Sequence, residues 1–354
     1  MTFGFFQIVC IKIGVVLGVS LGTVSYLIFA ERKIAAWAQD RLGPNRVGPY
    51  GLVQPLIDGA KLLIKEAVTP DYVVKPIYNL APMLAFIAAA IGFAVVPFGP
   101  VGASAPTFFG NKVDFQIAPS VDIGILYILA IGSLGVYGVI LGGWASNNKY
   151  SFLGGLRSSA QLISYEIPLG MSILGMILLT GSVDLSRIIE WQDRHVWGVF
   201  AQPLGFLLFL ISAFAETNRL PFDLPESEQE LVGGFHTEYS GMKFGLFFLG
   251  EYLHVITVSF LTVILFFGGW DLPFVLDQDQ TGWIAAFAKL GVMLFKVVLV
   301  IGFIMWVRWT LPRFRYDTLM DLAWKRMIPL ALINLTATAL VLFGLRGVLG
   351  YHFY

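Results

Sequence analysis

The sequence predicts an all-α fold, a polytopic membrane helical bundle with about eight transmembrane helices. Of its 354 residues, 57% are hydrophobic and only 13% are charged, and the mean hydropathy is +0.76. This composition leaves more apolar surface than one water-soluble core can bury. Apolar runs long enough to cross a bilayer also recur along the chain. They fall at about 4–30, 80–97, 121–143, 160–182, 198–217, 242–267, 284–308 and 328–346.

The first run is interpreted as a retained transmembrane helix. It is too long for the core of a signal peptide, and no basic leader precedes it. Because we find no convincing internal repeat, we treat residues 1–354 as a single integral membrane domain.

The loop after the first run contains a short amphipathic segment, GLVQPLIDGAKLLIKE, at 51–66. Gln54, Asp58, Lys61 and Lys65 follow at offsets of four, three and four, which places them on one stripe of a helix. The segment is too short to span, so we predict an interfacial helix. Snorkelling accounts for the two lysines but not for Asp58 among apolar neighbours.

Basic residues between the predicted spans are divided unequally between the two sides. The odd-numbered loops contain Arg32, Lys33, Arg41, Arg46, Lys61, Lys65, Lys75, Lys149, Arg157, Arg219, Arg308, Arg313, Arg315, Lys325 and Arg326. The other side has only Lys112, Arg187, Arg194 and Arg346. By the positive-inside rule, the odd-numbered loops are cytoplasmic and both termini lie on the outer face.

Residue usage excludes several functional classes. Cys10 is the only cysteine and the four histidines are scattered, so no internal disulfide, four-thiolate cluster or close metal pair is expected. There is no Walker loop and no dinucleotide-binding glycine fingerprint. We therefore expect the chain to bind no metal or redox cofactor itself. Net charge is zero, and nucleic acid is not an expected partner.

Acids are concentrated in ETNRLPFDLPESEQELVGGFHTEY, at 216–239, where Arg219 is the only lysine or arginine. Part of this has a structural explanation: Pro221 ends a helix, and Asp223 caps the next one with Glu226 as a capping box. Gly233 and Gly234 then stop that helix. This explanation does not account for Glu216, Glu230 and Glu238.

Further ionisable residues are predicted at membrane depth. They are Asp122, Glu166, Glu251, His254, Lys289 and Lys296. A charge there costs about 2.5–3.5 kcal/mol, so such groups usually face a bundle interior or a water-filled path. For His254 and Lys289 alone, a buried structural role is favoured. Together with Glu216 the set indicates a polar route, whose crowded carboxyls suit proton relay or charge sensing.

Four segments resemble a known family. They are 31–66, 142–166, 215–252 and 308–325, which include GLVQPLIDGAKLLIKE and PFDLPESEQELVGG. The chain is similar in order and spacing to the quinone-site membrane subunits of respiratory complex I, the proton-pumping NADH:quinone oxidoreductase. In bacteria this is the H subunit of the enzyme, and in mitochondria it is subunit 1. The resemblance covers nearly the whole chain.

The resemblance implies roles for particular residues, none of them catalytic in the strict sense. The quinone-tunnel residues would be Glu31, Arg32, Asp58 and Arg308. The proton-coupling acids would be Glu166, Glu216, Asp223, Glu226, Glu228, Glu230 and Glu251. Quinone would be the substrate, with FMN and iron–sulfur clusters in partner subunits. The partners would be peripheral-arm quinone-site subunits, antiporter-like membrane subunits and lipid, in a bacterial inner membrane.

Our mechanistic hypothesis is that a charge change in the tunnel reorganises 216–238 and passes a signal along Glu216, Glu251 and Glu166. Glu228→Gln or Glu230→Gln would then lower quinone reduction and pumping together. Two alternative functions are a homologous subunit of an energy-converting hydrogenase and a stand-alone ion-coupled secondary transporter. A purely structural anchor would not require Glu216 or Glu251 within the membrane.

Overall fold

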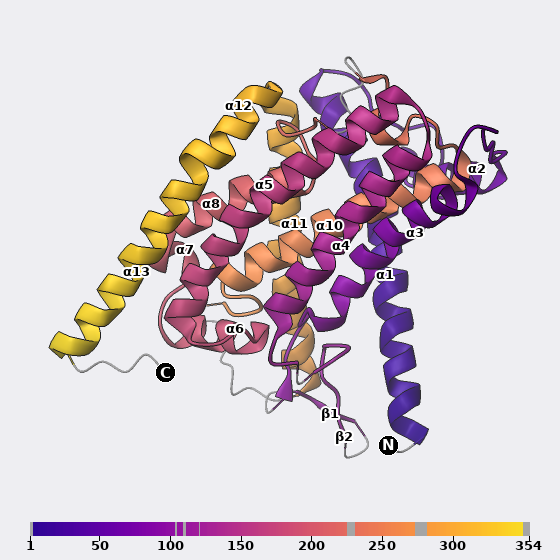
Figure 1. The fold of residues 1–354 in the computed structure, drawn as a ribbon. Helices are drawn as coiled ribbons and strands as arrows, with labels where there is room; N and C mark the ends of the chain where they lie inside the picture. Colours follow the sequence, from indigo (N-terminus) through magenta and orange to yellow (C-terminus); the bar gives the residue numbers. More distant parts are fainter. Residues whose placement is uncertain are drawn as a thin grey trace.

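A computed structural model describes residues 3–102, 105–108, 111–119, 121–224, 231–272 and 282–349. Its long helices run side by side as a tilted bundle (Figure 1). The inner helices are α3 (Lys75–Ile91), α4 (Gly124–Ala145), α5 (Lys149–Thr180) and α10 (Gly241–Phe266). At opposite edges lie α1 (Phe3–Ala38) and α13 (Ile328–Leu349), and α11 (Trp283–Thr310) passes behind α10. Helix α10 is the most buried, with 78% of its most apolar window enclosed.

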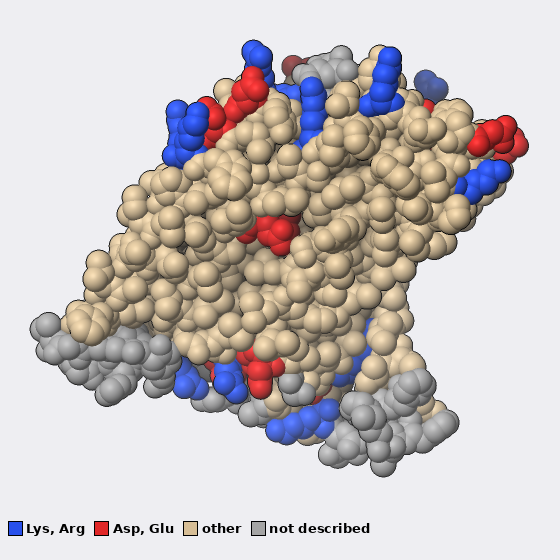
Figure 2. All heavy atoms as spheres, viewed as in Figure 1, with Lys and Arg blue, Asp and Glu red and all other residues tan. Residues whose placement is uncertain are grey.

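Seven helices in the described part of the chain are long and apolar enough to cross a membrane. The last of these spans, Tyr316–Gly344, joins α12 (Tyr316–Asp321), a π turn (Leu322–Met327) and α13. The structure thus confirms an all-α, multi-pass membrane bundle. In the view of Figure 2, most of the visible lysines, arginines and acids lie at the two ends, and the face between them is largely uncharged.

The predicted run 198–217 is two helices, α7 (Gly198–Ala201) and α8 (Pro203–Glu216). Proline lacks the N–H and clashes with the preceding turn, so Pro203 begins a helix rather than continuing one. The Gln202 side chain at the break donates to Thr338 Oγ1 at 2.7 Å and accepts from Asn334 Nδ2 at 2.9 Å. Helix α8 is about 21 Å long, shorter than the bilayer core.

Helix α5 begins eleven residues earlier than its apolar run, at Lys149. The Asn148 side chain caps it by accepting from the Tyr150 N–H at 2.9 Å. Small residues fill its first turns and allow close packing: a Cβ on Gly154 would lie 2.7 Å from Gly234 Cα, in the 3₁₀ turn η4 (Gly234–His236). Hydropathy does not register helices packed through small residues.

Short elements connect the helices at both ends (Figure 1). At one end, η1 (Pro49–Gly51) leads into α2 (Gln54–Ile64), which confirms the helix predicted at 51–66. At the other end lie both termini and α6 (Leu185–Arg194), with the antiparallel pair β1 (Thr107–Phe108) and β2 (Asn111–Lys112). The turn η2 (Gly92–Val95) continues α3.

Asp122 is not at membrane depth, contrary to the prediction. Helix α4 begins only at Gly124, so the Asp122 carboxyl is 80% exposed before it and faces Arg187 at 4.0 Å. It is a surface residue at the end of the bundle that holds α6.

Candidate functional site

The C-terminal part of α1 places Glu31 in a buried ionic cluster. Its side chain is 8% exposed and forms an ion pair with Arg308 from α11. Its Oε2 also accepts from the Tyr252 hydroxyl at 2.5 Å. Two of the predicted quinone-tunnel residues, Glu31 and Arg308, are therefore in direct contact although they are 277 positions apart.

Arg219 lies at the centre of this cluster. It comes from the turn after α8, and its Nη1 is 3.4 Å from Glu31 Oε1. Its Nε is 3.1 Å from Glu251 Oε1 on α10, and its guanidinium stacks 4.2 Å from the centroid of the Tyr252 ring. With an exposed fraction of 6%, Arg219 is a buried cation held by two carboxylates and an aromatic face.

The other two predicted tunnel residues form a separate pair. Arg32 Nη1 lies 2.6 Å from Asp58 Oδ2, and Gln54 Nε2 donates to Asp58 Oδ1 at 3.0 Å. This pair ties α2 to α1 and accounts for the acid among apolar neighbours. Because Arg32 is half exposed and Glu31 is buried, the two neighbours on α1 face different surroundings.

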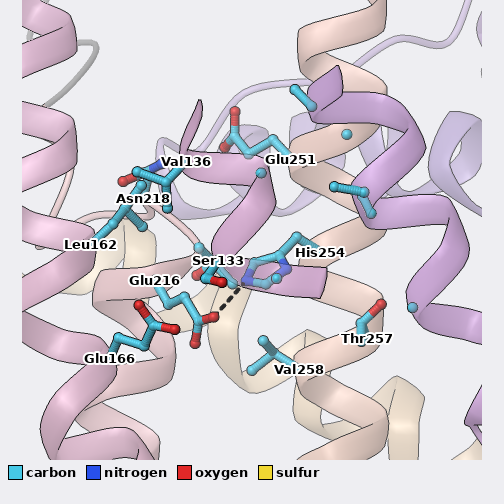
Figure 3. A pocket seen from close by; sticks show the side chains of 18 of the residues that line it. Ser133, Val136, Leu162, Glu166, Glu216, Asn218, Glu251, His254, Thr257 and Val258 are labelled. Atoms are coloured by element: carbon cyan, nitrogen blue, oxygen red, sulfur yellow. Dashed lines mark ion pairs between the residues drawn. The ribbon is translucent and has the colours of Figure 1, made fainter. Parts of the chain in front are cut away.

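A cavity of about 110 Å³ lies between α3, α4, α5, α8 and α10. Three of the predicted coupling acids, Glu166, Glu216 and Glu251, line it together with His254 and Asn218 (Figure 3). One water needs about 10–15 Å³ of such space, so the cavity has room for several. Figure 2 shows acidic atoms at mid-height of the uncharged face, away from both charged ends.

Glu216 pairs with His254 inside this cavity. Glu216 Oε1, at the end of α8, lies 3.3 Å from His254 Nε2 on α10 (Figure 3). Gly132 on α4 lies next to this pair. A Cβ added there would lie 3.7 Å from Glu216 Oε1 and 3.9 Å from His254 Cε1. His254 is therefore partnered by a cavity acid rather than packed as an isolated core histidine.

Among the other described acids of the 216–239 stretch, Asp223 and Glu238 do not line the cavity. Asp223 Oδ2 forms an ion pair with Arg313 Nη2 at 2.8 Å. The capping box of Asp223 with Glu226, and the coupling acids Glu226, Glu228 and Glu230, lie outside the described residues.

Glu238 has a structural role, because its hydrogen bonds connect three separate segments of the chain. Its carboxylate accepts from the Tyr72 hydroxyl at 2.7 Å and from Asn148 Nδ2 at 2.5 Å, and its backbone carbonyl accepts from Tyr78 at 2.7 Å. The hydrogen bond to Glu238 raises the pKa of Tyr72. Burial raises the pKa of the neighbouring Tyr239, whose ring stacks on Tyr78 with centroids 4.1 Å apart.

Comparison of the sequence with known proteins assigns the chain to a family. A family model described as NADH dehydrogenase matches residues 11–339. An H subunit of NADH-quinone oxidoreductase from Cytophaga hutchinsonii is 47% identical over 326 residues, or 90% of this chain and 92% of that protein. The H subunit of the same enzyme from Leptospira biflexa is 50% identical over 325 residues, 90% of each chain. An H subunit from Geobacter metallireducens is 49% identical over 332 residues, 94% of this chain and 95% of that protein.

The chain belongs to the H-subunit family of NADH-quinone oxidoreductase. The matched region contains every tunnel and coupling residue predicted above, from Glu31 to Arg308. Membership in the H-subunit family makes this chain a membrane component of an oxidoreductase complex, as the resemblance of its four segments implied.

Sequence reasoning missed two functional candidates of this H-subunit family chain. In the sequence Arg219 stands out only as the lone basic residue among acids, yet it contacts both Glu31 and Glu251. Gln161, a buried amide on α5, donates to the carbonyls of Ala215 at 2.7 Å and Phe222 at 2.8 Å. It thereby holds both ends of the turn that carries Arg219. A single basic residue in an acid-rich stretch is the available signal for Arg219; nothing in the sequence marks Gln161.

Proposed function

We propose that this chain is the membrane subunit of a proton-pumping NADH:quinone oxidoreductase, forming the quinone-access tunnel wall and coupling quinone reduction to proton translocation. The observation that carries the proposal is the position of Arg219. It contacts Glu31, which pairs with Arg308, and also Glu251, which lines the acid cavity. One buried cation thus connects the predicted tunnel residues to the predicted coupling acids.

On the tunnel side, Arg308 and Glu31 adjoin the inner ends of α11 and α1, and Arg32 and Asp58 border α2. Reduction of a quinone to a quinol consumes two electrons and two protons. Negative charge developing on the quinone would attract the arginines and weaken their hold on Glu31, because charge interactions are strong in a low dielectric. Arg219 would then redistribute between Glu31 and Glu251.

The electrons come from elsewhere in the complex under this proposal. A chain with one cysteine cannot supply the four thiolates of an iron–sulfur cluster. FMN and iron–sulfur clusters would belong to peripheral-arm partners docked on the inner end, around α2 and α12.

On the coupling side, acidic atoms are seen at mid-height of the largely uncharged face (Figure 2). A charged group facing hydrocarbon is costly, so a neighbouring membrane subunit with polar groups at that depth would cover it. This supports antiporter-like membrane subunits as partners along that face.

The orientation follows from the basic residues. The odd-numbered loops would be cytoplasmic and both termini would lie outside, in a bacterial inner membrane. Helices α2 and α12 stand at the same end of the bundle, opposite the termini, as this orientation requires (Figure 1).

The test is to isolate the chain from native membranes in mild detergent and to assay inhibitor-sensitive NADH:quinone reduction with flavin and iron content. Activity and cofactors that co-purify with the chain support the proposal. Isolation of the chain alone and colourless, from a preparation in which other large membrane complexes stay intact, would overturn it.

A further inference from the structure

The acid cavity contains one basic group among its described lining residues, the imidazole of His254. Glu216 on α8, Glu166 on α5 and Glu251 on its own helix line the same cavity, and of these Glu216 pairs with the imidazole (Figure 3). Helices α3 and α4 contribute only small or uncharged residues to the lining, such as Ala85, Gly132 and Ser133. The cavity therefore combines three carboxyls with one imidazole.

Arg219 forms an ion pair with one of these carboxyls, that of Glu251. Its Nε lies 3.1 Å from Glu251 Oε1, at the inner side of the cavity. Among the described residues, no basic side chain forms an ion pair with Glu166. Glu166, Glu216 and His254 are thus two carboxyls beside one imidazole.

His254 lies close in space to the other ionisable groups of the cavity. His254 is three residues after Glu251 on α10, so both side chains project from one face of that helix. Its Nε2 then lies 3.3 Å from Glu216 Oε1, and Glu216 shares the cavity with Glu166. His254 thus contacts Glu216 and shares one face of α10 with Glu251.

We propose that His254 is a proton-transferring residue of this cavity, taking a proton from the Glu251 side and delivering it to Glu216. The inference rests on the proposed function. In the transfer, the Nε2–H bond of the imidazolium breaks, its electron pair stays on nitrogen, and an O–H bond forms on Glu216. The imidazolium and the carboxylate become a neutral pair, so the transfer leaves neither of them charged. Neutral His254 keeps a proton on Nδ1, so it accepts the next proton from the Glu251 side after tautomeric exchange moves that proton to Nε2 or after the ring turns over.

Two features of the structure suit this step. The 3.3 Å separation needs only a small closing movement, or one bridging water, for which the cavity has room. Gly132 on α4 leaves open the space beside both groups, so that the pair can approach without displacing a side chain.

A merely structural histidine would neutralise Glu216 without exchanging its proton. The two roles differ in pH dependence, because an imidazole that turns over protons imposes its titration on the rate. They differ also in how His254 and Glu216 variants combine, since two members of one relay act on the same step.

The experiment uses inverted vesicles from cells expressing His254→Gln, Glu216→Gln or the double variant. Proton pumping and quinone-linked NADH oxidation are measured from about pH 5.5 to 8. Gln keeps a polar side chain of similar reach but cannot titrate. The matched control is Thr257→Val: Thr257 lines the same cavity one turn further along α10, and its hydroxyl donates only to its own helix, to Leu253 O at 3.1 Å.

The inference expects His254→Gln to lower pumping and quinone-linked oxidation about tenfold or more and to flatten their pH profile. The double variant should be no slower than the slower single variant. Thr257→Val should match the wild type, and NADH oxidation by a water-soluble acceptor should be unchanged throughout. If the His254→Gln enzyme keeps the wild-type pH profile, the inference is overturned, whether its absolute rate is high or low.

His254→Asn is the second variant if the first does not assemble. If neither variant assembles, the pH dependence of pumping in Glu216→Gln is the test. The relay requires Glu216→Gln to lose the pH dependence of the rate, and an unchanged pH dependence would overturn the inference. Failure of the proposed function is distinguishable, since then the wild-type vesicles themselves show no inhibitor-sensitive quinone reduction.

Discussion

Arg219 and Glu31 form an almost fully buried ion pair, with side-chain exposures of 6% and 8%. The two residues are 188 positions apart, on the turn after α8 and at the inner end of α1. Each also has a second partner of opposite charge, Glu251 for Arg219 and Arg308 for Glu31. Charge therefore alternates along these four residues, so that each buried charged group has a partner of opposite sign.

The first prediction concerns this alternation. Arg219→Met should lower the free energy of unfolding by about 3–5 kcal/mol, because it leaves two buried carboxylates without their shared cation. Arg219→Lys should recover only part of this, since an ammonium cannot stack on Tyr252 and reach both acids. Thermal unfolding of the detergent-solubilised complex measures the difference.

The control is Arg187→Gln, which breaks the exposed pair with Asp122. Surface substitutions of this kind usually change stability by about 0.5 kcal/mol or less. Equal unfolding temperatures for the Arg219 and Arg187 variants would contradict the buried pair.

The second prediction tests the close approach of α5 to η4. Gly154→Ala would place its Cβ 2.7 Å from both Gly234 Cα and Phe235 N, so backbone must move, at about 1–3 kcal/mol. Gly170→Ala on the same helix meets nothing within 4 Å and should stabilise by up to about 1 kcal/mol. Unfolding temperatures that shift in opposite directions confirm the packing; a shared direction would refute it.

The features that could be predicted from the sequence are those that depend on local rules. A bilayer demands about 20 apolar residues per helix, and α2 follows from the spacing of Gln54, Asp58 and Lys61. The first turns of α5 are not predicted because serine and glycine carry no hydropathy signal, although close packing requires them there.

The pairings of the site were beyond local rules. That Glu31 contacts Arg308, or that Glu216 contacts His254, depends on how α1, α8, α10 and α11 pack. The composition could show that charges at membrane depth need partners, but not which ones. The resemblance supplied the residue set; the structure divided it into a buried cluster, a half-exposed pair and a cavity.

The third prediction concerns the half-exposed pair. Asp58→Asn should cost less than about 1 kcal/mol of stability, because Arg32 and Asp58 are partly solvated. Under the proposed function it should raise the KM for quinone several-fold with little change in kcat, by loosening α2 from α1. The reversed pair, Arg32→Asp with Asp58→Arg, should restore most of the KM. If the KM stays raised in the reversed pair, the effect comes from one of the two residues by itself and not from their contact.

The last prediction uses His236, which lies outside the membrane-spanning helices among Phe235, Phe244 and Phe248. Burial lowers the pKa of His236 to about 4. In the unfolded chain a histidine binds a proton below about pH 6.5, while folded His236 stays neutral. Its contribution to stability is therefore fully present above about pH 6.5 and is lost as the pH falls toward 4.

The expected loss at pH 5 is about 2 kcal/mol, from about 1.4 kcal/mol per pH unit. His236→Phe should remove that part of the pH dependence, because phenylalanine fits the aromatic cluster and cannot bind a proton. His195→Gln, at an exposed position, serves as the comparison variant. Thermal unfolding between pH 7 and 5 measures all three proteins; an identical slope in wild type and His236→Phe would show that His236 is protonated in the folded chain.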